Sequence, residues 1–132
     1  MKKKYLLDTH FLIWVMNTPK NISKKTIEII KNKGNKVFVS QVSLWEIAIK
    51  QKIGKLEFLD SLESFKEDIE NAGFEYLRID DAHIFETLKI ELKSEHKDPF
   101  DRLLIAQAKT ENLVLITDDQ KFKLYNEIEI II

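Results

Sequence analysis

The sequence predicts an α/β fold with a mostly parallel central sheet of five strands and helices on both of its faces. Five short apolar runs, several of them rich in β-branched residues, are spaced along the chain. Segments of helical length separate these runs, and strands that alternate with helices are typical of parallel sheets. The chain has three glycines and two prolines, with no flexible linker, repeat or low-complexity tract. We therefore expect residues 1–132 to form one domain.

Each predicted strand is placed by one apolar run. The strands are expected over residues 5–7, 37–39, 76–79, 113–116 and 128–132. In an open parallel sheet, ligands bind beyond the carboxyl ends of the strands, near the point where the strand order reverses. The residues that follow the strands are therefore the first candidates for a functional site.

Side chains that commonly cap helices stand between the predicted strands. They are Ser23, Ser40 or Ser43, Ser61, Asp81 and Asp98. The helices that they begin are expected over residues 24–33, 44–51, 62–73, 82–93 and 100–111. Pro99 directly after Asp98 strengthens the last of these predictions, because proline is favoured at the first position of a helix.

Composition excludes several classes of protein. With 21 Lys plus Arg against 22 Asp plus Glu, the net charge is -1, so any contact with nucleic acid needs a local basic rim. The absence of cysteine excludes disulfides, thiolate catalysis and Cys-containing zinc sites. No apolar stretch approaches the roughly 18 residues of a membrane span, and Asp8 and His10 interrupt the first apolar run. We expect a cytoplasmic protein without membrane contact.

Acidic residues follow the first and the fourth of the predicted strands. Asp8 comes directly after the first strand, and Asp118 and Asp119 come after Thr117 at the end of the fourth. An aspartate in such a place is often only a helix N-cap, so each position has a simple structural explanation. The order of the elements nevertheless places these side chains on the same rim of the sheet.

Three more acidic residues belong to predicted helices. Asp98 and Asp101 lie at the cap and in the first turn of the last helix, where the helix dipole favours acidic side chains. Glu46 has apolar neighbours on almost every side of its helix, so its carboxylate is expected to be partly buried and to need a partner. Lys50, four residues later, is the ordinary partner for an ion pair of that kind.

The convergence of these carboxylates in one cleft predicts a metal site. Unpaired carboxylates that lie close together repel one another, and they respond by taking up protons or by binding a cation. Mg²⁺ and Mn²⁺ prefer oxygen ligands, and a Mg²⁺ site typically combines few carboxylates with water and phosphate oxygens. The chemistry that such a cleft best serves is metal-assisted hydrolysis of phosphodiesters.

Four blocks of sequence occur in order along the chain, each around one or two of these acids. They are Leu6-Leu7-Asp8-Thr9-His10, Ser40-x-x-Ser43-x-Trp45-Glu46-Ile47-Ala48-Ile49-Lys50, His96-x-Asp98-Pro99-Phe100-Asp101-Arg102-x-Leu104-Ile105-Ala106-Gln107-Ala108 and Thr117-x-Asp119-x-x-Phe122. One block alone would be weak evidence, but four at these intervals are specific. Over essentially its whole length the chain resembles the PIN-domain ribonucleases, and in particular the VapC-type toxins of toxin–antitoxin pairs.

This resemblance implies a Mg²⁺- or Mn²⁺-dependent endoribonuclease, a toxin whose substrate is RNA, on a PIN-like three-layer fold. The acids implied as both catalytic and metal-binding are Asp8, Glu46, Asp101 and Asp119. The resemblance further implies a small cognate antitoxin, whose tail we expect along Phe11, Trp14 and Trp45. A net charge near zero does little to keep copies apart, so a homodimer is also expected.

Further residues are candidates for supporting roles. The candidate accessory residues are Asp98, Asp118, Thr9, Ser43 and Thr117. The candidates for a basic rim that contacts RNA phosphates are Lys50, Lys52, Lys55 and Arg102. Capping remains the alternative for the hydroxyls, and solvated charge or an ion pair remains the alternative for the basic residues. The histidines show no metal-ligand spacing and are interpreted as structural or surface residues: His10, His83 and His96.

The alternative to an active nuclease is a catalytically inactive PIN-like module that only binds. Such a module would need no metal ion and would have no use for a full set of acids. Because all four acids of the implied quartet are present, the sequence favours the nuclease.

Overall fold

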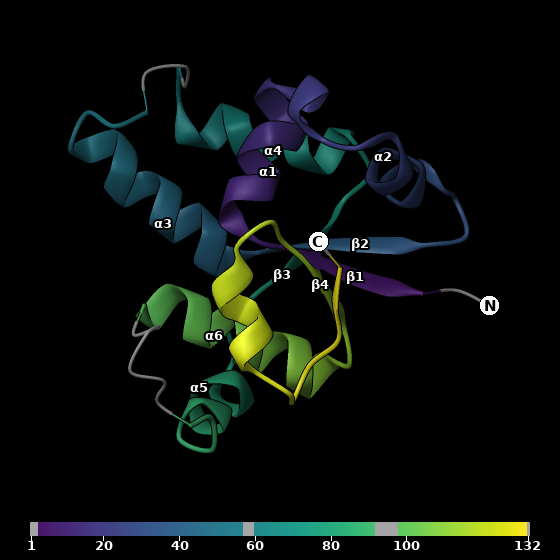
Figure 1. Ribbon diagram of the computed structural model, residues 1–132. Helices are drawn as coiled ribbons and strands as arrows, with labels where there is room; N and C mark the ends of the chain where they lie inside the picture. The colour runs from purple at the N-terminus through teal and green to yellow at the C-terminus, as the bar shows by residue number, and fades with distance from the viewer. Residues whose placement is uncertain (1–2, 57–59, 92–97, 132) are drawn as a thin grey trace.

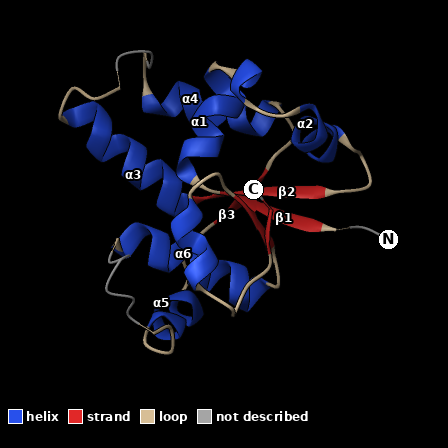
Figure 2. Ribbon diagram, viewed as in Figure 1, coloured by secondary structure: helices blue, strands red, loops and turns tan. Residues whose placement is uncertain are grey.

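Five parallel strands form the central sheet in a computed structural model that describes residues 3–56, 60–91 and 98–131. The strands are β1 Lys4–Leu7, β2 Lys36–Ser40, β3 Glu75–Leu77, β4 Val114–Ile116 and β5 Ile130–Ile131. Their order in the sheet is β3-β2-β1-β4-β5, and every pairing is parallel. The strand order therefore reverses at β1, the central strand of the sheet, whose strands are red in Figure 2. The predicted α/β class and five-stranded parallel sheet are confirmed.

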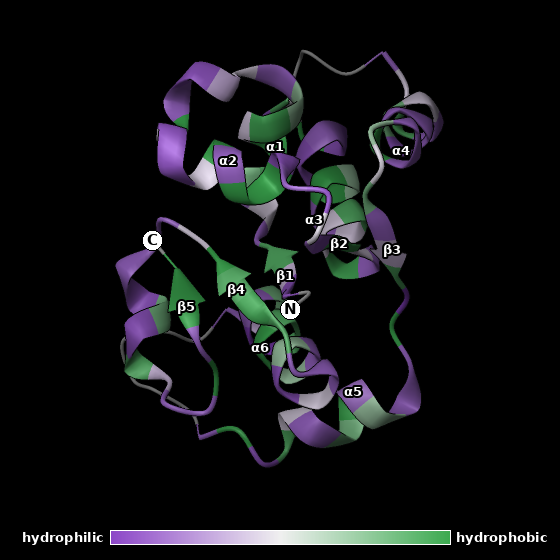
Figure 3. Ribbon diagram, turned by 90° about the vertical axis from the view of Figure 1, so that its right-hand side faces the viewer, coloured by the Kyte–Doolittle hydropathy of each residue, from purple (hydrophilic) through white to green (hydrophobic). Residues whose placement is uncertain are grey.

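Helices cover both faces of this sheet. The described residues form α1 Thr9–Asn17, α2 Lys24–Lys31, α3 Gln41–Lys52, α4 Leu62–Asn71, α5 Asp81–Thr87 and α6 Pro99–Glu111, with short 3-10 helices η1 Pro19–Asn21 and η2 Gln120–Leu124. Helices α1, α2 and α4 lie on one side of the sheet and α5 and α6 on the other, which gives three layers (Figure 1, Figure 3). Helix α3 runs outward from the carboxyl end of β2 and contacts both α1 and α6. Among these described helices we find no candidate for a membrane-spanning segment.

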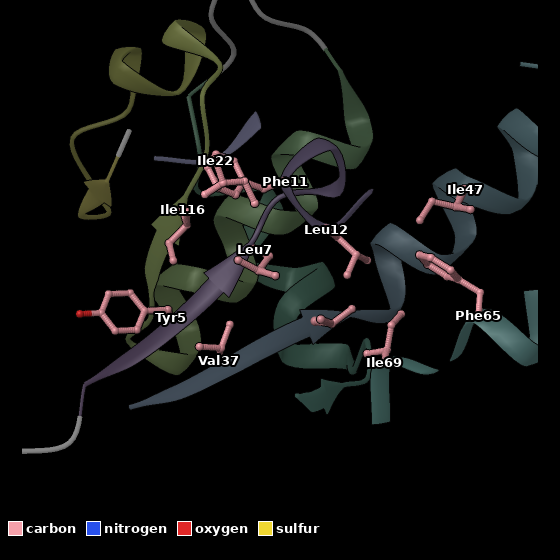
Figure 4. Close-up of a cluster of buried hydrophobic side chains, with 11 residues drawn as sticks. Tyr5, Leu7, Phe11, Leu12, Ile22, Val37, Ile47, Phe65, Ile69 and Ile116 are labelled. Carbon is pink, nitrogen blue, oxygen red and sulfur yellow. The ribbon is translucent and has the colours of Figure 1, made fainter. Parts of the chain in front are cut away.

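Alternating side chains of β1 enter two separate cores, one on each face of the sheet. Tyr5 and Leu7 pack in the core on the side of α1 and α4, where Leu12 and Ile69 are fully buried (Figure 4). Leu6 belongs to the opposite core, which α6 covers. Because three consecutive residues of β1 are buried, close packing on both faces fixes the end of the strand and the residue that follows it.

Helix α3 begins earlier than predicted. Ser40, rather than Ser43, is its N-cap, because the Ser40 hydroxyl accepts a hydrogen bond from the backbone N–H of Val42 at 2.9 Å. Gln41 in the first turn then reaches the segment after β3, where its Oε1 accepts from the backbone N–H of Ile79 at 3.1 Å. That contact takes the backbone of Ile79 out of the sheet, so β3 ends two residues earlier than the predicted strand.

The helix after β3 is shorter than predicted. It spans Asp81–Thr87 instead of residues 82–93, and Asp80 caps it by accepting from the backbone N–H of His83 at 3.2 Å. Beyond Thr87 the backbone continues in i to i+3 hydrogen bonds, such as that from Ile90 N–H to the Thr87 carbonyl. Such bonds tighten the chain and end the α-helix. Residues 92 and 93 of the predicted helix lie outside the described residues.

Candidate active site

The acidic side chains meet in one cleft beyond the carboxyl ends of β1 and β4. The cleft has a volume of about 150 Å³, and the described residues that line it are Asp8, Thr9, His10, Glu46, Lys50, Asp98, Asp101, Asp118, Asp119 and Phe122. Six of these are acids, contributed by the residues after β1 and β4, by α3 and by the start of α6. The structure therefore brings together all four acids of the predicted quartet and both candidate accessory acids. The cleft lies where the strand order reverses, which is where ligands of open parallel sheets bind.

Asp8 lies at the buried end of this cleft, with its side chain held by two hydrogen bonds. The residue is 5% exposed. Its Oδ1 accepts from the backbone N–H of Phe11 at 2.8 Å, and its Oδ2 accepts from the hydroxyl of Thr117. Burial raises the pKa of Asp8 to about 6, against the lowering effect of the two hydrogen bonds, and the charge of Asp118 raises it further. A negative charge on Asp8 is therefore costly unless a cation lies nearby.

Three acids of the cleft also serve as helix caps. Asp8 caps α1. Asp98 caps α6 by accepting from the backbone N–H of Phe100 at 2.8 Å, and Asp119 caps η2 by accepting from that of Lys121 at 3.0 Å. The simple structural explanation is thus correct at each position, but it does not exclude a site. A cap at the carboxyl end of a parallel strand places its carboxylate between the strand end and the helix start, where the cleft opens.

Glu46 has one paired and one unpaired carboxylate oxygen. Its side chain is 14% exposed, and its Oε2 lies 3.5 Å from Nζ of Lys50. Its Oε1 is buried and has no hydrogen-bond partner among the described residues. The predicted burial and the predicted partner are both observed. A buried carboxylate oxygen without a partner is costly, and a bound cation would remove that cost.

The donor set of the cleft fits a hard divalent cation. Carboxylate oxygens are preferred ligands of Mg²⁺ and Mn²⁺. The unpaired Oε1 of Glu46 is free to coordinate such a cation. The residues that would hold the ion are Asp8, Glu46, Asp101 and Asp119. Across the described residues, no three acids of the cleft bring one oxygen each within 4.8 Å of one another. Such spacing suits Mg²⁺, which takes few carboxylates directly and keeps several waters.

Comparison with protein families identifies the fold around this cleft. The model of the PIN domain matches residues 5–128, from β1 to the residues before β5. This chain belongs to the PIN-domain family. The resemblance that the four sequence blocks predicted is confirmed, and all four blocks lie within the matched residues. None of the curated proteins matches this chain.

Solved structures of VapBC complexes share the fold of this PIN domain. VapBC2 from Rickettsia felis, bound to a fragment of its promoter DNA, matches with 21% identity and a TM-score of 0.72 over 97% of both chains. DNA-bound VapBC from Salmonella typhimurium matches with 20% identity and a TM-score of 0.66, over 99% of this chain and 98% of the other. VapBC-5 from Mycobacterium tuberculosis, from a family of toxin–antitoxin systems, matches with 18% identity and a TM-score of 0.61 over 97% of both chains. At these identities the similarity establishes the fold.

A second group of potential metal ligands in this PIN domain is already hydrogen-bonded. Asp80, His83 and Glu111 each offer one ligand atom, all within 4.8 Å of one another, outside the lining of the cleft. Nδ1 of His83 accepts from the backbone N–H of Asp80 at 3.1 Å, and Nε2 lies 2.9 Å from a carboxylate oxygen of Glu111. Both ring nitrogens are in use, so His83 is structural, as predicted. His10 is exposed at the cleft, and His96 lies outside the described residues.

His83 belongs to a chain of buried polar side chains behind the cleft. The hydroxyl of Ser40 donates to Oε1 of Gln107, whose Nε2 lies 3.4 Å from both the Arg78 carbonyl oxygen and Nδ1 of His83. The side chains of Ser40, His83 and Gln107 are fully buried. No sequence pattern indicated this link between the start of α3 and α6, the two helices that contribute acids to the cleft.

Gln107→Leu is expected to lower the free energy of unfolding by about 2–4 kcal/mol. Leucine has a similar volume, but it removes the partner of the Ser40 hydroxyl and of the Arg78 carbonyl inside the core. Urea unfolding followed by circular dichroism measures the change. Gln120→Leu, at an exposed position, is the matched control and is expected to stay within about 0.5 kcal/mol of the parent. A Gln107→Leu variant as stable as the parent would contradict this role for Gln107.

The candidate hydroxyls join the elements that form the cleft. Thr9 donates to Oγ of Ser43 at 2.9 Å, and both residues are buried, so the start of α1 is tied to α3. Thr117 donates to Asp8 and accepts from the backbone N–H of Asp119 at 3.0 Å. Thr117 thus contacts two acids of the quartet, which is the position of a residue that orients metal ligands.

Of the four basic residues that the sequence suggests for RNA contact, only Lys50 is part of the described cleft lining. Lys52 and Lys55 are exposed near the end of α3. Nη1 of Arg102 donates to two backbone carbonyls of the segment after α5, at 3.3 and 3.4 Å. His10 also lines the cleft, although its sequence context predicted only a structural or surface role. Its place on the first turn of α1, two residues after the first acid, is the signal that points to the site.

Proposed function

We propose that this PIN domain is a Mg²⁺- or Mn²⁺-dependent endoribonuclease that cleaves cytoplasmic RNA as the toxin of a toxin–antitoxin pair. The observation that carries the proposal is the cleft itself, in which six acids meet where the strand order reverses. Membership of the PIN family supports the nuclease chemistry. The fold shared with VapBC structures supports the toxin role.

The chain's own residues bind the reactants and hold them in place in this proposal. A metal ion held in the cleft would activate a water molecule and stabilise the charge that develops on the phosphate. The residues that hold the ion are Asp8, Glu46, Asp101 and Asp119. Thr117 keeps the carboxylate of Asp8 in position through its hydrogen bond. Lys50 offers a positive charge to an RNA phosphate at the cleft.

Asp98 and Asp118 are accessory acids in this proposal. Both line the cleft, but neither belongs to the four acids that the resemblance implies as ligands, and Asp118 is exposed. In this proposal the charges of both residues attract a cation to the cleft, but neither carboxylate is a ligand of the ion.

RNA cleavage is expected to stop in EDTA and to return when Mg²⁺ or Mn²⁺ is added back. The acids supply charge and ligand oxygens but no strong nucleophile, so the reaction needs the ion to activate water. Cleavage of a mixed RNA pool, resolved on a denaturing gel, measures the effect. Asp8→Asn protein purified in parallel is the control for contaminating ribonuclease. Full cleavage by the parent in EDTA, with no residual metal, would contradict the proposal.

The alternative function is a catalytically inactive binding module with the same fold. It predicts that RNA is left intact with every metal ion tested, although the protein is folded. The unpartnered oxygen of Glu46 and the raised pKa of Asp8 favour the nuclease, because a module that only binds has no need of buried carboxylates that a cation would stabilise.

A small antitoxin is proposed as the regulatory partner. VapBC-5 from Mycobacterium tuberculosis belongs to a family of toxin–antitoxin systems. An apolar groove on this chain offers a place for a segment of such an antitoxin. The groove has a volume of about 810 Å³ beside α1, α2 and α4, and its apolar lining residues are Val15, Met16, Ile30, Val37, Ala72 and Phe74. Lys31 and Lys33 at its edge favour acidic residues in the partner.

The aromatic residues expected to contact the antitoxin differ in their exposure. Phe11 is 5% exposed and packs in the core of the α1 face, so the expectation that it contacts a partner is wrong. Trp14 is half-buried against the same core. Trp45 is exposed on α3, where its ring packs edge-on against Phe100.

A homodimer is proposed on the basis of exposed apolar side chains. Two helices carry them: Trp45, Ile49 and Ile53 on or just after α3, and Ile84, Phe85 and Leu88 on or just after α5. Large apolar side chains gathered on a surface mark interfaces, and a second copy would bury them.

Light scattering is expected to give the mass of a dimer for the purified chain.

Expression of the chain alone is expected to arrest growth, and co-expression with the neighbouring open reading frame is expected to relieve the arrest. Asp8→Asn expressed alone is the control, because it keeps the surface and removes cleavage. A strict monomer that is harmless alone and binds no product of its own operon would contradict the toxin role.

A further inference from the structure

One side chain that lines the acidic cleft is positively charged. Among the described side chains that line it, Lys50 is the one with a full positive charge. Its Nζ lies 3.5 Å from Oε2 of Glu46, one turn earlier on α3. The ammonium therefore stands beside a carboxylate that is implied as a metal ligand.

This pair differs from an ordinary ion pair on a helix surface. The side chain of Glu46 is 14% exposed and that of Lys50 is 32% exposed, so the carboxylate is largely removed from water. Lys66 and Glu70 on α4 form the surface counterpart, also four residues apart, with Glu70 50% exposed. A charge partner matters more to the buried carboxylate, because water does not solvate it well.

The contact between Lys50 and Glu46 is incomplete. A strong hydrogen bond from an ammonium to a carboxylate spans about 2.7–2.9 Å, and 3.5 Å is longer. The second oxygen of Glu46 remains buried without a partner among the described residues. Lys50 thus offsets the charge of Glu46 but leaves it able to accept another cation.

We propose that Lys50 is the built-in counter-charge of the metal-free cleft, which moves from Glu46 to an RNA phosphate when a divalent ion binds. This inference rests on the proposed function, because it needs a metal site at Glu46. Two cations beside one carboxylate repel each other, so the ammonium and the ion compete for Glu46. The lysine has a flexible four-carbon stem and a partly exposed side chain, which allow its ammonium to reach a phosphate at the mouth of the cleft.

The inference predicts effects of opposite sign on metal binding and on RNA cleavage. Without the competing ammonium, Glu46 binds the ion more tightly. Without the same ammonium, the RNA phosphate loses a contact and the KM for RNA rises. An ordinary helix pair predicts neither effect, since its loss changes stability by only a few tenths of a kcal/mol.

The test compares Lys50→Met with Lys66→Met in the full-length protein. Titration calorimetry with Mn²⁺ alone is expected to show about five- to twentyfold tighter binding by Lys50→Met at low ionic strength, with a smaller gain at high salt. Steady-state cleavage of a defined RNA is expected to show a KM raised about tenfold. Lys66→Met removes the lysine of a matched helix pair outside the cleft and is expected to change neither value. Lys50→Arg keeps the charge and is expected to retain most of the parent's Mn²⁺ affinity.

The outcomes distinguish a failure of this inference from a failure of the proposed function. Parent protein that binds no Mn²⁺ overturns both. Parent protein that binds Mn²⁺, with Lys50→Met binding it no more tightly than Lys66→Met does, overturns the counter-charge role alone. Weaker Mn²⁺ binding by Lys50→Met also overturns it, and Lys50→Gln repeats the measurement with a polar side chain in case methionine disturbs the helix.

Discussion

Replacing Asp119 with asparagine is expected to abolish RNA cleavage, whereas Asp118→Asn is expected to retain most of it. Both residues line the cleft, but they are held differently. The backbone N–H of Asp119 donates to the hydroxyl of Thr117, and its carboxylate caps η2, so the half-buried side chain has a fixed position. Asp118 is exposed. A metal ligand needs a fixed position, so we expect Asp119 rather than Asp118 to be the ligand.

A loss of similar size is expected for every member of the quartet. The variants are Asp8→Asn, Glu46→Gln, Asp101→Asn and Asp119→Asn, and each is expected to lower the cleavage rate about a hundredfold or more, because each removes one negative charge from the proposed metal site and keeps the shape of the side chain. Asp98→Asn and Asp118→Asn are expected to lower it by less than about tenfold. Initial rates on a defined RNA in Mn²⁺ measure the effect.

Circular dichroism on each variant separates a lost ligand from a lost fold. An inactive Asp118→Asn beside an active Asp119→Asn would move the ligand role by one residue. Cleavage at the parent's rate by every variant of the quartet would remove the cleft from the reaction altogether.

The fold class was predictable because the strands are short, apolar and separated by segments of helical length. Element boundaries were harder to predict, because side chains distant in sequence decide them. The side chain of Gln41 binds the backbone of Ile79 and ends β3 early. The chain from Ser40 through Gln107 joins residues that are 67 positions apart. Contacts of that range leave no periodic pattern in the sequence.

The candidate acids were predictable as a group, but their local sequence could not separate a cap from a ligand. The structure shows why, since Asp8, Asp98 and Asp119 are caps and also line the cleft. The parallel pairing of β1 with β4 brings Asp8 and Asp119 together, and the start of α6 adds Asp98 to the same cleft. The local sequence also could not show which of the basic residues lies in the cleft. Lys50 and Lys52 lie two residues apart on α3, and the turn of the helix places only Lys50 in the described lining.

Asp8→Asn is expected to be more stable than the parent at neutral pH in EDTA, although it is inactive. Burial raises the pKa of Asp8 from 3.8 to about 6 in the folded chain, so the folded state binds this proton more tightly than the unfolded state does. The parent therefore loses stability as the pH rises from about 4 to about 6, and the loss is complete above that range, where the carboxyl is ionised in both states. The shift corresponds to about 3 kcal/mol at most.

Asparagine retains the cap, because its Oδ1 accepts from the N–H of Phe11 and its amide donates to the Thr117 hydroxyl. Since hydrogen bonds to a charge are stronger than those to an amide, the net gain is expected to be about 1–3 kcal/mol at pH 7.5 and close to zero at pH 4. Urea unfolding at both pH values measures it, with the exposed Asp118→Asn as the matched control that gains much less.

Added Mn²⁺ is expected to reverse the order of stability, because it binds the folded parent and the asparagine variant lacks one of its ligands. Without metal, an Asp8→Asn variant that is less stable than the parent at pH 7.5 would show that the buried carboxylate is not a liability. A difference from the parent that stays the same between pH 4 and pH 7.5 would show that the stability change does not come from the ionisation of Asp8. The combination of a gain in EDTA and a loss in Mn²⁺ has one physical source, a buried negative charge that the fold accommodates only when a cation offsets it.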